Sequence, residues 1–190
     1  MDIEYEFPFG WKEMWGLAYR TDYDLKNHMK NSGVDLNYRD QKTNEKFIPH
    51  VIEPTFGLSR LLITILINAY HEEEVNGKKR TVLKLKPCLS PVKVAVFPLQ
   101  KDENLKIKAL ELLSDLKKIY VCEFDDSGNI GQMYRRQDEI GTPFCVTIDY
   151  QTIKDNMVTV RNRDTMVQER IDVGKLKNYL VKKLDLPAGR

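Results

Sequence analysis

The stretch from residue 92 to residue 149 constrains the fold most, because strand and helix patterns alternate along it without interruption. Val92–Phe97 is a short, almost wholly apolar run of the kind that forms a buried strand. In chain order we expect a strand over 92–97, a helix over about 102–117, a strand over 119–124, a helix over 130–140 and a strand over 143–149. Such alternation favours parallel strands joined by right-handed helical crossovers.

The segment that follows completes this predicted domain. Residues 157–161 and 166–171 alternate between apolar and polar side chains on either side of the polar turn 162–165, which is typical of a hairpin. A last helix is expected over about 173–184, where leucines recur at helical spacing. The sequence therefore predicts an α/β fold: a five-stranded mixed sheet with three helices.

The first half of the chain is less complete. There we expect a strand over 13–20, a helix over 22–32, a polar loop over 37–46, a strand over 48–53 and a helix over 57–73. These are too few strands for a closed domain, so they read as part of a larger antiparallel sheet. The polar, proline-containing stretch 75–91 looks like a connection between domains. We therefore predict two domains, residues 1–86 and 87–190.

Composition excludes several classes of protein. The chain has 190 residues, 42% of them hydrophobic and 31% charged, as in an ordinary globular protein. No apolar run reaches the roughly 18 residues that span a bilayer, and the N-terminus does not resemble a signal peptide. We expect a cytoplasmic protein with no membrane partner. The net charge of +2 makes no broad basic field, so DNA is not an expected partner.

Local basic clusters could still bind nucleic acid, although each alone is first interpreted as a solvated surface. The clusters are Lys78-Lys79-Arg80, Arg135-Arg136, Arg161 with Arg163, and Lys182-Lys183. The three cysteines, Cys88, Cys122 and Cys145, are expected to be buried, reduced thiols. The three histidines have no metal-ligand spacing, and His71 is expected to lead into an acidic helix end at residues 72–74.

The junction Glu53–Arg60 has the layout of a ligand site. A carboxylate at the end of a strand is followed by a Pro-Thr-Phe-Gly turn, and Arg60 then falls in the first turn of a helix. Free N–H groups at a helix start favour an anion, and a glycine lets a ligand approach the backbone. The alternative is a turn that only begins a core helix, with Glu53 and Arg60 paired, and spacing alone does not decide between the two.

Three stretches carry a family resemblance. Residues 51–60, Val-Ile-Glu-Pro-Thr-Phe-Gly-Leu-Ser-Arg, resemble motif three of the class II aminoacyl-tRNA synthetases, and specifically that of the glycyl-tRNA synthetases. Residues 10–25 are similar to the strand and helix before that motif. Residues 125–131 and 138–144 are similar to the anticodon-binding domain of the same family. The stretches occur in the family's order and span most of the chain.

The resemblance implies roles for the junction. The family's enzymes activate glycine with ATP and transfer it to tRNA(Gly), so ATP with Mg²⁺ is expected as a substrate, without a tightly bound cofactor. Arg60 matches the motif-three arginine that contacts ATP, and Glu13 matches an acidic residue that helps hold the triphosphate and its Mg²⁺, so these two are the catalytic candidates. The implied ATP site is Glu13, Met14, Gly57, Leu58, Ser59 and Arg60; the implied glycine site is Glu53, Pro54, Thr55, Phe56 and Gly57.

The next helix start holds two further carboxylates, Asp22 and Asp24, which we interpret as helix caps. Arg20 is expected to neutralise this acidic cluster or to approach the acceptor end of the tRNA. In the C-terminal domain the resemblance implies that a loop of tRNA is read by stacking and hydrogen bonds. The anticodon candidates are Arg135, Arg136, Asp138, Glu139, Arg161 and Arg163.

The chain departs from the family pattern in one respect. Motifs one and two are missing, and no Arg-x-Glu of motif two occurs in it. We therefore expect the C-terminal portion of a synthetase, inactive and monomeric by itself, from an enzyme that is a homodimer at full length. The alternatives are a non-catalytic synthetase-like module, which binds tRNA or serves a polymerase as an accessory subunit, and a generic nucleotide-binding α/β protein.

Overall fold

The computed structural model describes residues 1–184 and divides the chain into two compact units, with the division between Thr64 and Ile65. We call residues 1–64 the N-terminal unit and the described residues from 65 onward the C-terminal unit. This division lies upstream of the domain boundary predicted at 86/87, which stays a prediction. The last six residues of the predicted second domain, 185–190, lie outside the described part of the chain.

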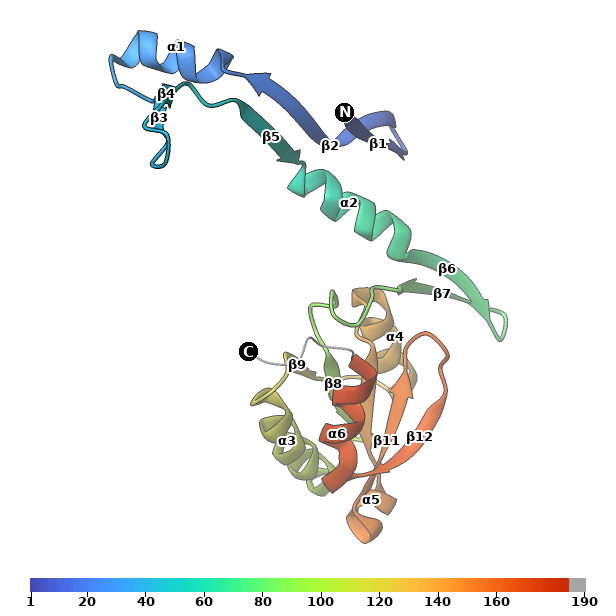
Figure 1. Cartoon of the computed structure of the whole chain (residues 1–190). Coiled ribbons are helices and arrows are strands. Elements are labelled where there is room, and N and C mark those ends of the chain that lie inside the picture. Colours follow the sequence, from blue (N-terminus) through green and yellow to red (C-terminus); the bar gives the residue numbers. More distant parts are fainter. Residues whose placement is uncertain (185–190) are drawn as a thin grey trace. The chain divides into compact units, whose positions relative to one another are not determined.

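The N-terminal unit is built on a three-stranded antiparallel sheet (Figure 1). Its order is β1 (Asp2–Phe7), β2 (Gly10–Thr21) and β5 (Val51–Phe56). Helix α1 (Tyr23–Ser32) follows β2 and ends at Gly33, whose φ of 71° is left-handed. The loop predicted over 37–46 contains a two-residue pair, β3 (Tyr38–Arg39) with β4 (Lys46–Phe47). The partial antiparallel sheet expected from the sequence is confirmed.

This unit has almost no hydrophobic core of its own. Within residues 1–64, all of which the structure describes, Phe7 is the only buried hydrophobic residue. Trp11, Phe56 and Leu58 are each more than half exposed. The unit thus leaves most of its large apolar side chains exposed. The exposure agrees with the expectation that these strands belong to a larger sheet.

Helix α2 (Leu58–Ala69) ends four residues before its predicted end at residue 73, because the chain turns there into a hairpin. Strand β6 (Tyr70–Val75) pairs with β7 (Lys78–Leu83) across the turn Asn76-Gly77, and both turn residues have positive φ, 53° and 71°. Asn-Gly between two strands is the strongest short hairpin signal. The interpretation of residues 72–74 as an acidic helix end was wrong, and the stretch interpreted as a domain connection contains a strand that was not predicted.

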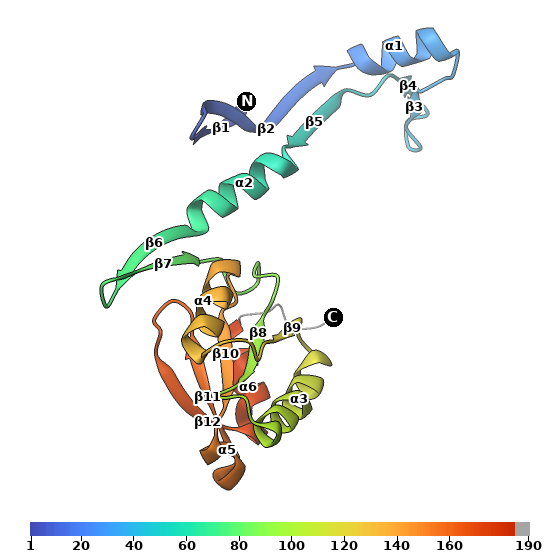
Figure 2. The same cartoon turned by 180° about the vertical axis from the view of Figure 1, so that it is seen from behind.

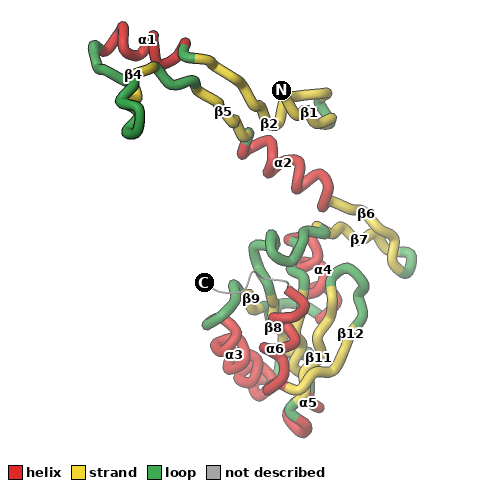
Figure 3. Tube along the Cα trace, viewed as in Figure 1, coloured by secondary structure: helices red, strands yellow, loops and turns green. Residues whose placement is uncertain are grey.

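The C-terminal unit contains the predicted five-stranded mixed sheet, in the order β12-β11-β10-β8-β9. Its strands are β8 (Val94–Pro98), β9 (Cys122–Phe124), β10 (Phe144–Ile148), β11 (Met157–Asn162) and β12 (Gln168–Asp172). Strand β8 is parallel to both β9 and β10, whereas β11 is antiparallel to its two neighbours. Figure 3 shows the sheet in yellow between helices in red. The prediction of an α/β fold is confirmed.

The three predicted helices are α3 (Glu103–Lys117), α4 (Ile130–Ile140) and α6 (Val173–Leu184). A short fourth helix, α5 (Tyr150–Asp155), was not predicted, although Asp149 and Thr152 form a capping box at its start. The sheet's two faces bury different cores. Val94 and Val96 pack with the leucines of α3 and α6, whereas Ala95 and Phe97 pack with Met133 of α4. Figure 2 shows α4 on the face of the sheet opposite α3 and α6.

A buried ion network joins the β6–β7 hairpin to the rest of the C-terminal unit. Arg80 of β7 and Asp138 of α4 are both fully buried, and Arg80 Nε lies 2.9 Å from Asp138 Oδ2. Arg161 of β11 donates to both carboxylate oxygens of Asp138, at 2.8 and 3.0 Å. Arg80 also binds Glu73 at 2.7 Å, within the hairpin. Two cations and one carboxylate are thus held together away from water.

A third buried arginine, Arg163, makes hydrogen bonds in the same region. Arg163 Nη1 donates to the carbonyl of Gly141, and its Nη2 donates to the carbonyl of Leu85, each at 2.7 Å. The carbonyl of Arg163 itself accepts a hydrogen bond from Arg80. Burial, the largest single influence, lowers the pKa of Arg80, but the hydrogen bonds and charges of Asp138 and Glu73 together outweigh it, and the net pKa is raised. The hairpin therefore belongs structurally to the C-terminal unit.

We predict that Asp138→Asn lowers the free energy of unfolding of the C-terminal unit by about 3–5 kcal/mol, because Arg161 then becomes an uncompensated buried charge and Arg80 keeps only its pair with Glu73. Asp115→Asn is the control: it breaks the exposed Lys118–Asp115 pair and is expected to leave stability almost unchanged. Urea denaturation followed by circular dichroism measures both, since both tryptophans lie in the N-terminal unit. Equal, small effects of the two substitutions would contradict the prediction.

Candidate functional sites

The junction between β5 and α2 brings four of the predicted ligand-site residues together. Strand β5 runs antiparallel to β2, with Phe56 opposite Trp15. Just past that pair, the N–H of Gly57 donates to the carbonyl of Met14 at 3.0 Å. Arg60, one turn into α2, donates from Nη1 to the carbonyl of Glu13. The predicted ATP-site residues of the two segments are therefore adjacent.

Gly57 is required at this crossing by space. A Cβ added there would lie 2.9 Å from the Met14 carbonyl oxygen, closer than real Cβ atoms come to backbone oxygens. The limit is weaker at Gly16, where a Cβ would lie 2.9 Å from Oε1 of Glu13, the end of a flexible side chain that can move. The backbone of β2 and the backbone at the start of α2 are thus in direct contact, because Gly57 has no side chain to separate them. Leu58 and Ser59 at the helix start are both exposed.

Glu53 and Arg60 are not paired with each other, so the pairing considered for this junction is wrong. Glu53 Oε2 lies 3.3 Å from Nε of Arg20, and Glu53 Oε1 accepts from the Thr55 hydroxyl at 3.1 Å. Arg20 also donates to Asp24 at 2.9 Å, which lowers the pKa of that carboxyl. The prediction that Arg20 neutralises the acidic cluster of Asp22 and Asp24 holds for Asp24 alone, because Asp22 pairs with Lys26. Glu53 remains about half exposed.

The interpretation of Asp22 and Asp24 as helix caps was wrong in its contacts. Asp22 stands at the N-cap of α1, but its side chain makes no capping hydrogen bond and instead pairs with Lys26 at 2.6 Å. Asp24 is held by Arg20. Nearby basic side chains four residues away compete successfully for both carboxylates.

The cysteines only partly match the expectation from the sequence. Cys122 and Cys145 are buried, and burial raises the pKa of Cys122 to about 11, but Cys88 is exposed, against expectation. Among residues 1–184 no group of three metal-ligating side chains is close enough to hold an ion. In the same range, no helix is both long and apolar enough to cross a bilayer.

A basic cavity lies beside the start of helix α4. Its volume is about 590 Å³, and it is lined by Lys78, Asn129, Gly131, Gln132, Arg135, Arg136 and Glu139. Asn129 and Gln132 form a capping box that fixes the helix start. Three of the lining residues, Arg135, Arg136 and Glu139, are predicted anticodon candidates. The sequence analysis placed Lys78 only in a basic surface cluster. It did not predict the hairpin that brings Lys78 to this cavity.

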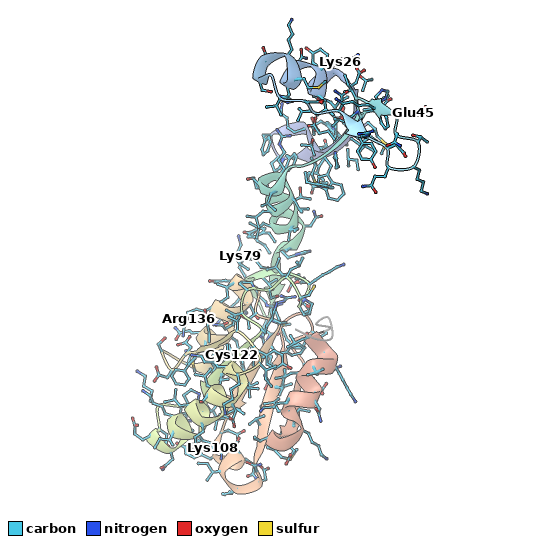
Figure 4. All side chains as sticks on the ribbon, turned by 60° about the vertical axis from the view of Figure 1, so that its left-hand side comes forward. Lys26, Glu45, Lys79, Lys108, Cys122 and Arg136 are labelled. Atoms are coloured by element: carbon cyan, nitrogen blue, oxygen red, sulfur yellow. The ribbon has the colours of Figure 1, made fainter. Side chains whose placement is uncertain are left out.

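The two arginines of the cavity differ in how they are held. Arg136 is anchored to the loop before α4, with its Nη2 2.6 Å from Asp125 and hydrogen-bonded to Ser127. Burial by itself raises the pKa of Asp125, but hydrogen bonds from Ser127 and Arg136 lower it by a larger amount, so the pKa lies below its usual value. Arg135 has a buried Nη1 without a hydrogen-bond partner among the described residues. Figure 4 labels Arg136, which projects outward from α4.

The other three anticodon candidates lie inside the fold. Asp138, Arg161 and Arg163 are exposed by 0%, 6% and 1%, and all belong to the buried network described above. Their side chains are occupied by internal hydrogen bonds, which favours a structural role. Direct contact of these three residues with RNA stays a prediction.

Comparison with known proteins identifies the class of the C-terminal unit. Residues 93–183 match the family model described as anticodon binding domain. The fold is similar to that of the RNA-binding domain of threonyl-tRNA synthetase from Cryptosporidium parvum Iowa II. The TM-score is 0.69 and the identity 19%, over 96% of this chain and 42% of that one. Residues 93–183 of the C-terminal unit thus form an anticodon-binding domain, and the solved structure has a similar fold.

Sequence relatives define the family more narrowly. The chain is 56% identical over 96% of its length to a glycine–tRNA ligase of Caldanaerobacter subterraneus subsp. tengcongensis. It is 54% identical over 97% to those of Clostridium beijerinckii and Thermobifida fusca. It covers 39%, 40% and 42% of these relatives. The chain belongs to the glycyl-tRNA synthetase family and corresponds to its C-terminal, anticodon-binding portion.

We predict that Gly57→Ala loosens the junction, because the new Cβ cannot coexist with the Met14 carbonyl at 2.9 Å. Amide hydrogen exchange of the whole chain should become faster around residues 14–17 and 56–61. Ser59→Ala, two residues along on an exposed face, is the control and should leave exchange unchanged. Unchanged exchange in the glycine variant would show that the close approach does not hold the junction.

Proposed function

We propose that this chain is part of a glycine–tRNA ligase, which activates glycine with ATP and transfers it to tRNA(Gly). The observation that carries the proposal is sequence identity of 54–56% to glycine–tRNA ligases over nearly the whole chain. The chain spans about 40% of the length of these relatives, so the complete activity belongs to a longer protein. A ligase of this kind works where proteins are made, in the cytoplasm.

The junction supplies one half of the adenylation site in this proposal. A glycine carboxylate oxygen attacks the α-phosphorus of ATP and pyrophosphate leaves, so the protein's task is to position the reactants and neutralise charge. Arg60 is the cation for the triphosphate, and Glu13 faces the Mg²⁺ that ATP brings as a co-substrate. The contact between Arg60 and the Glu13 carbonyl supports a shared site. Met14, Gly57, Leu58 and Ser59 complete the ATP side.

Glycine itself is received by the turn from Glu53 to Gly57. A site for the smallest amino acid must bind an ammonium group and exclude side chains. Glu53 is the proposed ammonium ligand, and its hydrogen bond from Thr55 fixes one carboxylate oxygen. Pro54 and Phe56 shape the turn. Arg20 balances the negative charge of Glu53 when no substrate is present.

The C-terminal unit supplies recognition of the tRNA anticodon. Unstacked loop bases are read by hydrogen bonds and by stacking on guanidinium planes. Arg135, Arg136 and Glu139 line the cavity beside α4 and are the proposed contacts. We propose an indirect role for Asp138, Arg161 and Arg163: they fix α4 against β7 and β11 and make no contact with the RNA themselves. The ligase names of the relatives do not favour a non-catalytic accessory module.

We predict that the chain binds an anticodon stem-loop of tRNA(Gly) more tightly than one with an altered anticodon, by about tenfold for one changed base. Arg135→Gln should abolish most of that preference. Fluorescence anisotropy with labelled stem-loops measures both. Equal affinity for the two RNAs would overturn the anticodon-reading role.

The same preparation tests the assignment of the junction as half a site. The chain alone is expected to be a monomer and to catalyse no ATP–pyrophosphate exchange with glycine, whereas the full-length enzyme, expected to be a homodimer, does so. In that enzyme Arg60→Ala should lower exchange by about 10²-fold or more, since one charge-stabilising donor is removed. Exchange activity in the isolated chain would refute the half-site proposal.

A further inference from the structure

We propose that Lys78 of the β6–β7 hairpin binds a backbone phosphate of the RNA whose anticodon the α4 residues read. This inference rests on the proposed anticodon function and extends its surface to an element outside the matched domain, residues 93–183. Lys78 lines the cavity together with Arg135 and Arg136, although 57 residues separate it from Arg135 in the sequence. Strand β7 packs directly against α4.

The alternation of β7 determines which lysine faces the cavity. Side chains at i, i+2 and i+4 of a strand share one face. Lys78, Arg80 and Val82 share such a face, and the last two are fully buried against the C-terminal unit. Lys79 lies on the opposite face of the strand. Two adjacent lysines therefore have different surroundings, and only Lys78 lines the cavity.

The cavity has an excess of cationic groups. Among residues 1–184, neither Lys78 nor Arg135 forms an ion pair, whereas Arg136 is already paired with Asp125. Glu139 is the one carboxylate that lines the cavity. The buried Nη1 of Arg135 is a further donor without a hydrogen-bond partner among the described residues. These groups together fit an anionic ligand.

The chemistry of the lysine indicates which part of the RNA it meets. A lysine ammonium is a compact point charge that suits a phosphate, whereas planar guanidinium groups suit bases and bidentate acceptors. The fully buried Arg80, two residues away, clamps the hairpin through Asp138 and Glu73. Lys78 thus lies on a paired strand that Arg80 anchors two residues away, so little backbone ordering opposes binding.

The test compares Lys78→Gln with Lys79→Gln in the full chain. Stem-loop binding is measured between 50 and 200 mM salt, a range over which each phosphate contact changes affinity by about 3.5-fold. Lys78→Gln is expected to reduce the slope of log affinity against log salt by about 0.9 or less, one contact's worth, and to leave the anticodon preference unchanged. Lys79→Gln is expected to keep the wild-type slope.

Three results would overturn the inference while wild-type binding remains anticodon-dependent. One is an unchanged slope in the Lys78 variant, and another is the same reduction in both variants, which would show a diffuse charge effect. The third is binding of inorganic phosphate that Lys78→Gln abolishes without any change in RNA binding, which would identify a site for a free anion. Loss of anticodon dependence in the wild-type chain would instead refute the proposed function itself.

Discussion

The buried pairing of Arg80 with Asp138 is the interaction on which the C-terminal unit depends. It links a hairpin to helix α4, and Arg161 brings β11 to the same carboxylate. A buried ion pair contributes less to stability than its geometry suggests, but removing one partner is strongly destabilising. The network therefore acts mainly to fix position: it holds α4, and with it the basic cavity, in one place relative to the hairpin.

Arginines of the same predicted function turn out to have two different roles. Arg161 and Arg163 satisfy carboxylate and carbonyl groups inside the fold, whereas Arg135 and Arg136 line a cavity at its surface. The buried set supports the exposed set through Asp138, because that aspartate lies on α4 itself. The result is an RNA-binding surface whose cations come from a rigid helix and a rigid strand, as precise recognition requires.

Much of this could be predicted from sequence, and the failures have physical causes. Short apolar runs located β8, β9 and β10, two-residue alternation located β11 and β12, and helical spacing located three helices. The motif at residues 51–60 located the junction. The β6–β7 hairpin was missed because its charged side chains mask the strand pattern, although Asn76-Gly77 signals it. The burial of Arg161 and Arg163 was missed because a charged residue is expected at the surface unless its distant partner is known.

The most direct test of the central claim is where RNA contacts the chain. Amide chemical shifts of the labelled protein, followed during titration with the tRNA(Gly) anticodon stem-loop, report every contacted segment. The account predicts that the largest changes cluster at residues 75–79 and 129–139, around the cavity. Changes confined to α6, with its basic Lys182 and Lys183, or to the N-terminal unit, would contradict it.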